Sequence, residues 1–244
     1  MHARTLAGTV LIVASAALAA CSSDNVLGLG LAGGGSADTL NTARVRIANA
    51  TATSFDVASK GIVFAGNAGI SFGLSSNCTP TNALAPDLSV RVAGTLTPVP
   101  GLAATYQIGL NYTVIAFPGP LGGTLFATIA DDFTPVAGQS ALRVFNAGAV
   151  GTSYDVYVTD PGAPLATATP SFSAVTGGTF TTFGNANADT PRQVRVTNAG
   201  SKIVLLDLGN TALIAGQSVT LVIAPPLVGT SALRFFYVTG CNVV

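Results

Sequence analysis

The sequence predicts an all-β protein in which two tandem β-sandwich domains follow a signal peptide and a flexible tether. Charged residues make up only 8% of the 244 residues and hydrophobic residues 49%. Residue types that favour strands are abundant, and 28 glycines with 13 prolines divide them into short runs. An ordered set of motifs also recurs about 100 residues further along the chain, which indicates a duplicated unit.

Residues 1–20 have the features of an export signal. His2 and Arg4 give a short positive start, and a largely apolar stretch of residues follows, up to Ala20. This stretch is shorter than the roughly 20 residues that a membrane-spanning helix needs. It ends in Leu18-Ala19-Ala20-Cys21, which resembles the lipobox of bacterial lipoproteins.

That resemblance implies cleavage before Cys21 and attachment of fatty acyl chains, palmitate among them, to this cysteine. Several chains give durable membrane attachment, whereas one gives only marginal binding. The alternative is an ordinary secretory signal that happens to end near a cysteine. Ser22 stands where an Asp would favour the inner membrane, so we expect a lipid-anchored protein of the cell envelope at the outer membrane.

Residues 21–42 contain the acylated cysteine and a Gly-rich tether, and the two repeats follow at residues 43–137 and 138–244. The boundary lies in the turn-rich stretch 131–138. A Gly-rich coil of this length reaches about 25 Å, enough to hold a domain clear of the lipid headgroups. After cleavage, nine basic residues face ten Asp residues, and without a basic patch we expect no nucleic-acid partner.

Four landmarks of the first repeat have counterparts in the second. The motif around Asn49 matches the one around Asn146, and Asp56 matches Asp155. The other two matches are Val90-Arg91-Val92 with Val194-Arg195-Val196, and Tyr112-Thr113-Val114-Ile115 with Val219-Thr220-Leu221-Val222. Each repeat contains six or seven short strand-like runs, the spacing of a β-sandwich with one buried and one wet face per sheet.

These motifs resemble the bacterial domain of unknown function 4397, over most of residues 43–240. The resemblance implies tandem immunoglobulin-like sandwiches on exported or surface-anchored proteins, and it transfers no catalytic residue. The second repeat departs from the pattern at Val219 and lacks a matching Asp pair. The motifs that carry the resemblance are Arg46-Ile47-Ala48-Asn49-Ala50, Phe55-Asp56-Val57, Tyr112-Thr113-Val114-Ile115, Asp131-Asp132, Arg143-Val144-Phe145-Asn146-Ala147 and Tyr154-Asp155-Val156-Tyr157-Val158.

Charged residues recur in both repeats as Arg46 with Asp56 and Arg143 with Asp155. Each pair could clamp a ligand through charge-assisted hydrogen bonds. A feature present in both copies is more typical of the scaffold. We therefore expect structural ion pairs between strands, with an Asp that holds backbone amides at a strand end as the other structural alternative.

Asp131 and Asp132 raise the possibility of catalysis or calcium binding. Glycosidase chemistry needs two carboxyl groups that face each other, whereas neighbours on a strand point to opposite faces. Calcium would need further oxygen ligands, with Asp87, Asp160 and Asp189 as distant candidates. The sequence therefore favours a polar turn before Pro135, and it predicts no metal site and no cofactor.

Enzymatic activity is not expected. No histidine follows His2, so the mature chain has no imidazole to serve as a base or a metal ligand. The two remaining cysteines, Cys78 and Cys241, are too few for a typical zinc site. In an oxidising compartment they favour a disulfide, which would require the repeats to fold back side by side; two free thiols are the alternative.

These features together predict a non-enzymatic envelope lipoprotein. Its membrane contact would be the lipid anchor, and its partners surface glycans or envelope proteins bound by loops. The alternatives are a purely structural spacer and, third, a hydrolase that uses Asp carboxylates. Three Pro-rich loops could hold a ligand site, and nothing in the sequence ranks them: 98–101, 118–120 and 161–164.

Overall fold

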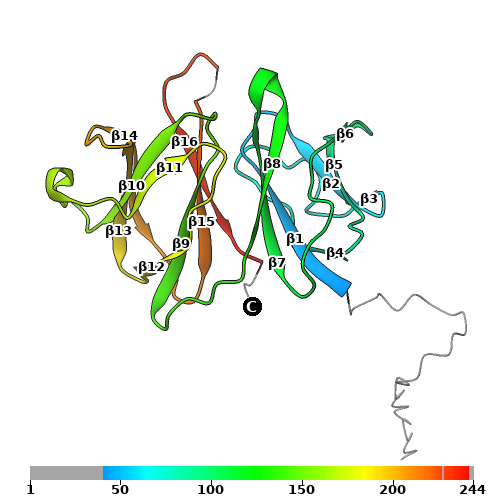
Figure 1. Ribbon diagram of the computed structural model, residues 1–244, viewed down its shortest axis with the longest axis horizontal. Coiled ribbons are helices and arrows are strands. Elements are labelled where there is room, and N and C mark those ends of the chain that lie inside the picture. Colours follow the sequence, from blue (N-terminus) through cyan, green and yellow to red (C-terminus); the bar gives the residue numbers. More distant parts are fainter. Residues whose placement is uncertain (1–40, 227, 242–244) are drawn as a thin grey trace, which may run out of the picture. The chain divides into compact units, whose positions relative to one another are not determined.

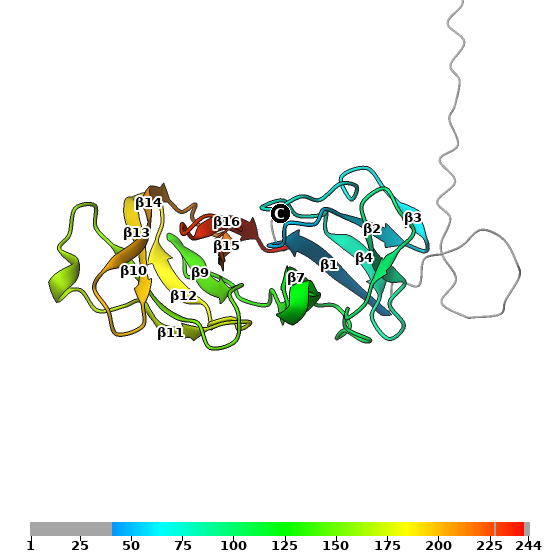
Figure 2. The same cartoon turned by 90° about the horizontal axis from the view of Figure 1, so that it is seen from above.

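The computed structural model describes residues 41–226 and 228–241, which are all-β, with two short 3-10 helices and no α-helix among them (Figures 1 and 2). The predictions for residues 1–40, including the signal peptide, the tether and the lipidation of Cys21, lie outside the described residues. No helix in the described part is long and apolar enough to cross a membrane.

Sixteen strands form four sheets of four strands each. The first eight are β1 (Thr42–Asn49), β2 (Phe55–Ser59), β3 (Ile62–Val63), β4 (Thr79–Asn82), β5 (Leu88–Val92), β6 (Pro98–Val99), β7 (Asn111–Pro118) and β8 (Thr124–Ala130). The second eight are β9 (Gln139–Asn146), β10 (Ser153–Thr159), β11 (Phe172–Thr176), β12 (Gly184–Asn187), β13 (Pro191–Asn198), β14 (Val204–Ala212), β15 (Ser218–Ala224) and β16 (Arg234–Thr239). The 3-10 helices are η2 (Pro120–Gly122) and η3 (Leu165–Thr167).

The strand order of the first two sheets repeats in the other two. Strands β1–β8 make the sheets β4-β1-β7-β8 and β3-β2-β5-β6, and strands β9–β16 make β12-β9-β15-β16 and β11-β10-β13-β14. Adding eight to each strand number converts one pair of sheets into the other. The halves even share a parallel pair, β1 with β7 and β9 with β15, among otherwise antiparallel neighbours.

Each half has eight strands, not the six or seven that the sequence suggests, because β3 and β6 have only two residues each. The hairpin between β2 and β3 shows how local chemistry sets such short elements. Lys60 and Gly61 form its two-residue loop with φ of 50° and 78°. Both positive values match the turn that a tight hairpin requires, and Gly61 adopts its value without strain.

The paired sheets of each half enclose an apolar core. In the first half, Val45 and Ile47 of β1 pack with Phe55 and Val57 of β2, from the opposite sheet. The second half has an equivalent core built on β9, β10, β13 and β15. These contacts make each half sandwich-like, with alternate residues of each strand pointing inward.

A third core lies between the halves. It joins the sheet β4-β1-β7-β8 to the sheet β12-β9-β15-β16, and the rings of Phe117 and Phe145 meet in it at 5.3 Å between centroids. The expectation that each sheet has a solvent-exposed face is therefore wrong for these two sheets. The unbroken apolar runs Val114–Phe117 and Leu221–Ala224 are the sequence signal for strands buried on both faces. The described residues accordingly belong to a single compact unit.

One part of the predicted repeat alignment needs correction. Asp56 accepts a hydrogen bond from the backbone N–H of Gly94, and Asp155 accepts the corresponding bond from Gly200. In register, Arg91 lies opposite Asp56, but Thr197 lies opposite Asp155. The counterpart of Val90-Arg91-Val92 is therefore Val196-Thr197-Asn198. The predicted match was displaced by two residues, a shift that preserves the alternation of faces and so leaves the hydrophobic pattern intact.

Candidate functional site

The structure contradicts the two predicted ion pairs. Arg46 and Asp56 lie on β1 and β2, which belong to opposite sheets of the first half. The residues beside each of them, Val45 and Phe55 for example, point into the core between the sheets. Both charged side chains therefore point outward, on opposite sides of the sandwich. The same argument separates Arg143 on β9 from Asp155 on β10.

Both aspartates instead hold backbone amides of neighbouring loops. Asp56 accepts hydrogen bonds from the N–H groups of Gly69 and Gly94, at 2.7 and 2.9 Å. Asp155 does the same with Ala174 and Gly200, at 2.8 Å each. The second structural alternative, an Asp that organises a strand end, describes these contacts. The recurrence of the motif is thus explained by turn geometry.

The two arginines point to the interface between the halves and act there in a reciprocal way. The Nη1 group of Arg143 donates to the backbone oxygen of Ala130, at the end of β8. The Nη1 group of Arg46 donates to the backbone oxygen of Thr239, at the end of β16, and to its Oγ1 at 2.9 Å. An arginine of each half therefore donates a hydrogen bond to the end of the last strand of the other half.

Arg143 forms a buried ion pair with Asp131. Its Nη2 donates to Asp131 Oδ1 at 2.5 Å, and the two side chains are 1% and 0% exposed. Burial lowers the pKa of Arg143, while the charge and hydrogen bond of Asp131 oppose that shift. The guanidinium also lies 4.4 Å from the ring centroid of Phe183. These contacts hold the interface together, because the charge of Arg143 is balanced by Asp131 and its guanidinium packs against an aromatic ring.

Asp131 and Asp132 differ completely in environment. The Oδ2 atom of Asp131 accepts hydrogen bonds from Thr113 Oγ1 and from the backbone N–H of Cys241, at 2.8 and 3.2 Å. Asp132 is exposed. The structure does not bring them together with the distant calcium candidates: Asp87 bonds to Thr81, and Asp160 pairs with Arg192. Within the described residues, no three potential metal-binding side chains cluster.

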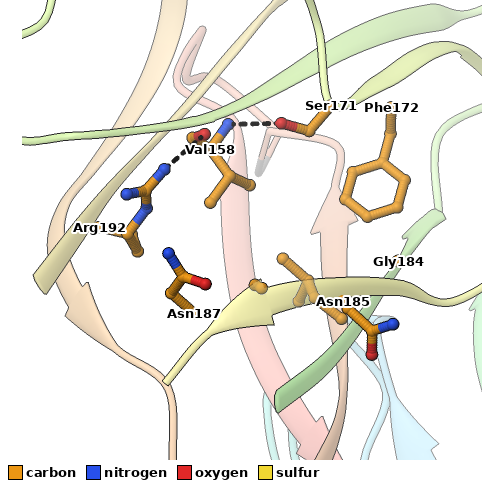
Figure 3. Close-up of a pocket in the computed structure, with 9 residues that line it drawn as sticks. Val158, Ser171, Phe172, Gly184, Asn185, Asn187 and Arg192 are labelled. Carbon is orange, nitrogen blue, oxygen red and sulfur yellow. Dashed lines mark hydrogen bonds between the residues drawn. The ribbon is translucent and has the colours of Figure 1, made fainter. Parts of the chain in front are cut away.

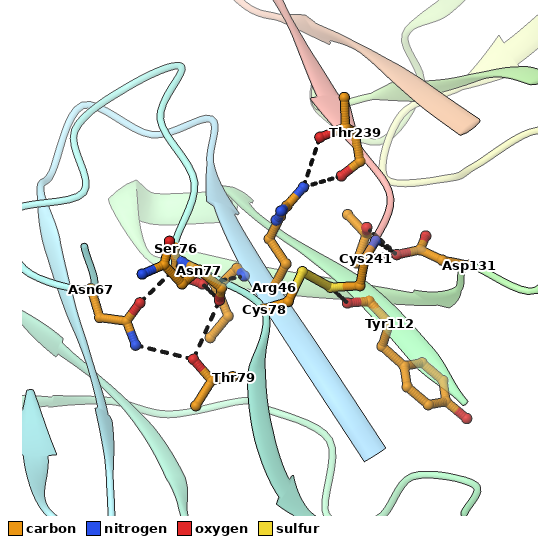
Figure 4. The surroundings of a disulfide bond; sticks show 12 residues. Arg46, Asn67, Ser76, Asn77, Cys78, Thr79, Tyr112, Asp131, Thr239 and Cys241 are labelled. Atoms are coloured by element: carbon orange, nitrogen blue, oxygen red, sulfur yellow. Dashed lines mark hydrogen bonds between the residues drawn. A yellow bond between two sulfur atoms is a disulfide. The ribbon is translucent and has the colours of Figure 1, made fainter. Parts of the chain in front are cut away.

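A disulfide joins Cys78 to Cys241, at a sequence separation of 163 and with 5.7 Å between their Cα atoms (Figure 4). Cys78 directly precedes β4 of the first half, and Cys241 follows β16 of the second. The bond lies beside Arg46 and Asp131, and the N–H of Cys241 donates to the latter. The side-by-side arrangement that the sequence analysis required for this bond is the one the third core provides.

The best candidate for a ligand site is a pocket of about 220 Å³ in the second half (Figure 3). It opens beside the edge strand β12, between the two sheets. Arg192 and Asn187 lie on one side of it and Phe172 on the other. Its lining residues are Leu142, Val158, Ser171, Phe172, Gly184, Asn185, Ala186, Asn187 and Arg192.

The polar groups of this pocket have spare hydrogen-bonding capacity. Asn187 is exposed beside Arg192, and its side-chain amide has no hydrogen-bond partner among the described residues. Ser171 accepts a bond from the N–H of Val158 at 3.1 Å and retains its own proton to donate. Such unpaired donors and acceptors around an aromatic ring can recognise a small polar ligand.

The corresponding place in the first half is filled. Register equates Gly184 with Thr79 and Ala186 with Thr81, since these residues pair with equivalent positions of β9 and β1. Thr79 accepts a bond from buried Asn67 at 3.0 Å, and Thr81 donates to Asp87 at 2.9 Å. Small residues in the second half replace this network and leave room for the ring of Phe172, 3.5 Å from a Cβ built on Gly184.

Sequence reasoning named none of the residues that give this pocket its character. It did mark the loop 161–164, which follows Asp160, the ion-pair partner of Arg192. The loops 98–101 and 118–120 do not contribute to the pocket. The available signal was the run Gly184-Asn185-Ala186-Asn187, a short strand with amides at alternate positions, which becomes informative only when compared with Thr79-Pro80-Thr81-Asn82.

A second cavity, of about 260 Å³, lies at the link between the halves. Its lining carries no charged side chain, and the hydroxyl of Ser218 is already committed to the backbone oxygen of Phe133, at 3.1 Å. Its residues are Phe133, Thr134, Pro135, Gly216, Gln217, Ser218 and Gly240. This cavity therefore lacks a charged side chain of the kind that Arg192 supplies to the pocket beside β12. Comparison of the chain with protein-family models and with curated protein sequences finds no match.

Proposed function

We propose that this protein is a non-enzymatic, lipid-anchored protein of the cell envelope whose second half binds a saccharide in the pocket beside β12. The anchor rests on the lipobox-like sequence before Cys21. Each sandwich-like half is proposed to be an immunoglobulin-like domain of the kind that the sequence motifs resemble. The absence of histidine after His2 supports binding without catalysis.

The chemistry of the pocket suits a sugar ring. The side-chain amide of Asn187 and the hydroxyl of Ser171 can exchange hydrogen bonds with ligand hydroxyls, and the negative face of the Phe172 ring attracts polarised C–H groups. The pocket is smaller than the roughly 300–1,000 Å³ typical of drug-sized ligands, so it fits a small unit such as one ring of a glycan. Its opening beside an edge strand leaves the rest of a glycan chain outside.

The observation that carries this proposal is the difference between the halves. One scaffold, with one strand order, satisfies its polar groups internally at Thr79 and Thr81, whereas the equivalent residues Gly184 and Ala186 border an open pocket. Packing alone would favour the filled version, because unpaired polar groups and empty space add no stability. The open version is therefore attributed to ligand binding.

Saccharide binding can be measured by ligand-observed NMR and titration calorimetry with methyl glycosides and envelope oligosaccharides. We expect Phe172→Ala to weaken binding by roughly tenfold, equivalent to about 1.4 kcal/mol of lost contact. Gly184→Thr, which restores the residue of the first half, should obstruct the pocket. The control Asn210→Ala changes an exposed residue of β14, outside the pocket, and should leave binding unchanged. An affinity for saccharide that is unchanged in both Phe172→Ala and Gly184→Thr would show that the ligand binds elsewhere.

The anchor has its own test, intact-mass analysis of the protein extracted from its native membranes. We expect a chain that begins at Cys21 and carries the added mass of a diacylglycerol and one further acyl chain. Substitution Cys21→Ala should release the protein into the soluble fraction, because it removes the membrane anchor that the sequence predicts. A native chain with an unmodified thiol at Cys21 would contradict the proposed anchor.

A spacer role is the second candidate, and the interface between the halves favours it. The third core, the ion pair of Asp131 with Arg143 and the Cys78–Cys241 bond hold two sandwiches as one unit. A rigid unit keeps whatever is bound to one half at a fixed position relative to the other half. If the pocket binds no saccharide while the anchor is present, the spacer role becomes the better account.

A further inference from the structure

We propose that the saccharide carries a carboxylate, that Arg192 binds this group, and that Asp160 competes with it. This inference rests on the proposed saccharide binding and narrows the ligand to acidic sugars. Arg192 is the one charged residue in the lining of the pocket. Every other lining residue is neutral, and the nearby negative charge is that of Asp160, which pairs with Arg192 without lining the pocket.

The guanidinium of Arg192 is well placed for an anion. Its side chain is 22% exposed, so it is partly desolvated yet reachable, and it borders the pocket beside Asn187 (Figure 3). Within the described part of the chain it contacts only an oxygen of Asp160 and, at 3.5 Å, the backbone oxygen of Val158. A guanidinium has five N–H donors, so donors remain for a planar carboxylate.

The present partner of Arg192 is easily replaced. Asp160 is 79% exposed and begins the loop that runs through Pro161 and Gly162 to η3. An ion pair with one side chain in water contributes little to stability, typically up to about 1 kcal/mol. A ligand carboxylate that gains extra hydrogen bonds from Asn187 and Ser171 can therefore displace Asp160. When no ligand is bound, the same pair keeps the cation neutralised.

The test compares sugars that differ only in the acidic group. Methyl glucuronide is measured against methyl glucoside, and the galacto and manno pairs likewise, by titration calorimetry on the full chain. We expect at least one acidic sugar to bind roughly tenfold more tightly than its neutral partner, the effect of one charge-assisted contact. Arg192→Gln, which keeps a hydrogen-bonding head but no charge, should remove this preference, and Arg192→Lys should retain part of it.

The competitor gives a second and opposite readout. Asp160→Asn should tighten binding of the acidic sugar by about 1.5- to 5-fold and leave the neutral sugar unchanged. Because this variant gains affinity, misfolding cannot imitate it. Equal binding of acidic and neutral sugars, or a preference that survives Arg192→Gln, overturns this inference but leaves saccharide binding intact. If none of the six sugars binds, both the inference and the proposed function fail.

Discussion

Asp131→Asn should lower the free energy of unfolding by about 3–5 kcal/mol, the cost of leaving a buried charge without its partner. The substitution keeps the shape of the side chain but removes the negative charge that balances Arg143 at the interface. Arg46 also interacts electrostatically with Asp131, so the substitution removes a favourable negative charge from both arginines. Urea denaturation followed by circular dichroism measures the change.

A matched control lies one residue away. Asp132→Asn makes the same chemical change at an exposed position, where it removes only a weaker attraction to Arg143 without a hydrogen bond, and should shift the unfolding free energy by less than about 0.5 kcal/mol. Replacement of both partners, Asp131→Asn with Arg143→Met, should cost less than the sum of the two single substitutions, since the orphaned charge is gone. Equal losses in Asp131→Asn and Asp132→Asn would show that the buried pair does not hold the interface.

Loss of the Cys78–Cys241 bond should reduce stability by about 5 kcal/mol at most, with about 2–4 kcal/mol the typical range for a disulfide. The bond closes a long loop, with 163 residues of sequence separation, and it restricts the unfolded chain correspondingly. The measurement is the urea midpoint of the wild-type chain with and without a reducing agent. The third core and the ion pair remain, so the reduced protein should still fold.

The double substitution Cys78→Ser with Cys241→Ser serves as the control. Its midpoint should match that of the reduced wild-type chain and should not respond to the reducing agent. Alkylation before and after reduction, followed by mass analysis, counts the free thiols in the native protein. Two alkylated cysteines without prior reduction would show that the bond is absent, and the alternative of two free thiols would then hold.

The fold class was predictable because it follows from local chemistry. Strand-forming residues separated by Gly and Pro, and landmarks such as Asn49 and Asn146 repeated in order, lead to an all-β chain with an internal repeat. The interface between the halves was not predictable, because its residues also look like ordinary core. Ile115 and Phe117 face opposite ways from Val114, and only the assembled sheets show that both faces of β7 are buried.

The pairing of charges failed for a related reason. Recurrence in both repeats linked Arg46 to Asp56, whereas the strands that carry them belong to different sheets. The true partner of Arg143, Asp131, was noticed only as half of an Asp pair. The pocket was missed because it depends on two small residues, Gly184 and Ala186. A single sequence does not show that larger side chains are lacking at these positions.

The reciprocal reach of Arg46 and Arg143 is the pattern that a symmetric homodimer shows at its two-fold axis. In such a dimer every substitution appears twice, so a favourable change on one side is repeated on the other. Here the two sides are covalently one chain and can differ. Asp131 lies beside Gly240, which has no side chain. A Cβ atom on residue 240 would lie 3.4 Å from the carboxyl carbon of Asp131. A carboxylate at position 240 would crowd the carboxylate of Asp131. Two identical subunits would carry both carboxylates, whereas a single chain can have Asp on one side and Gly on the other.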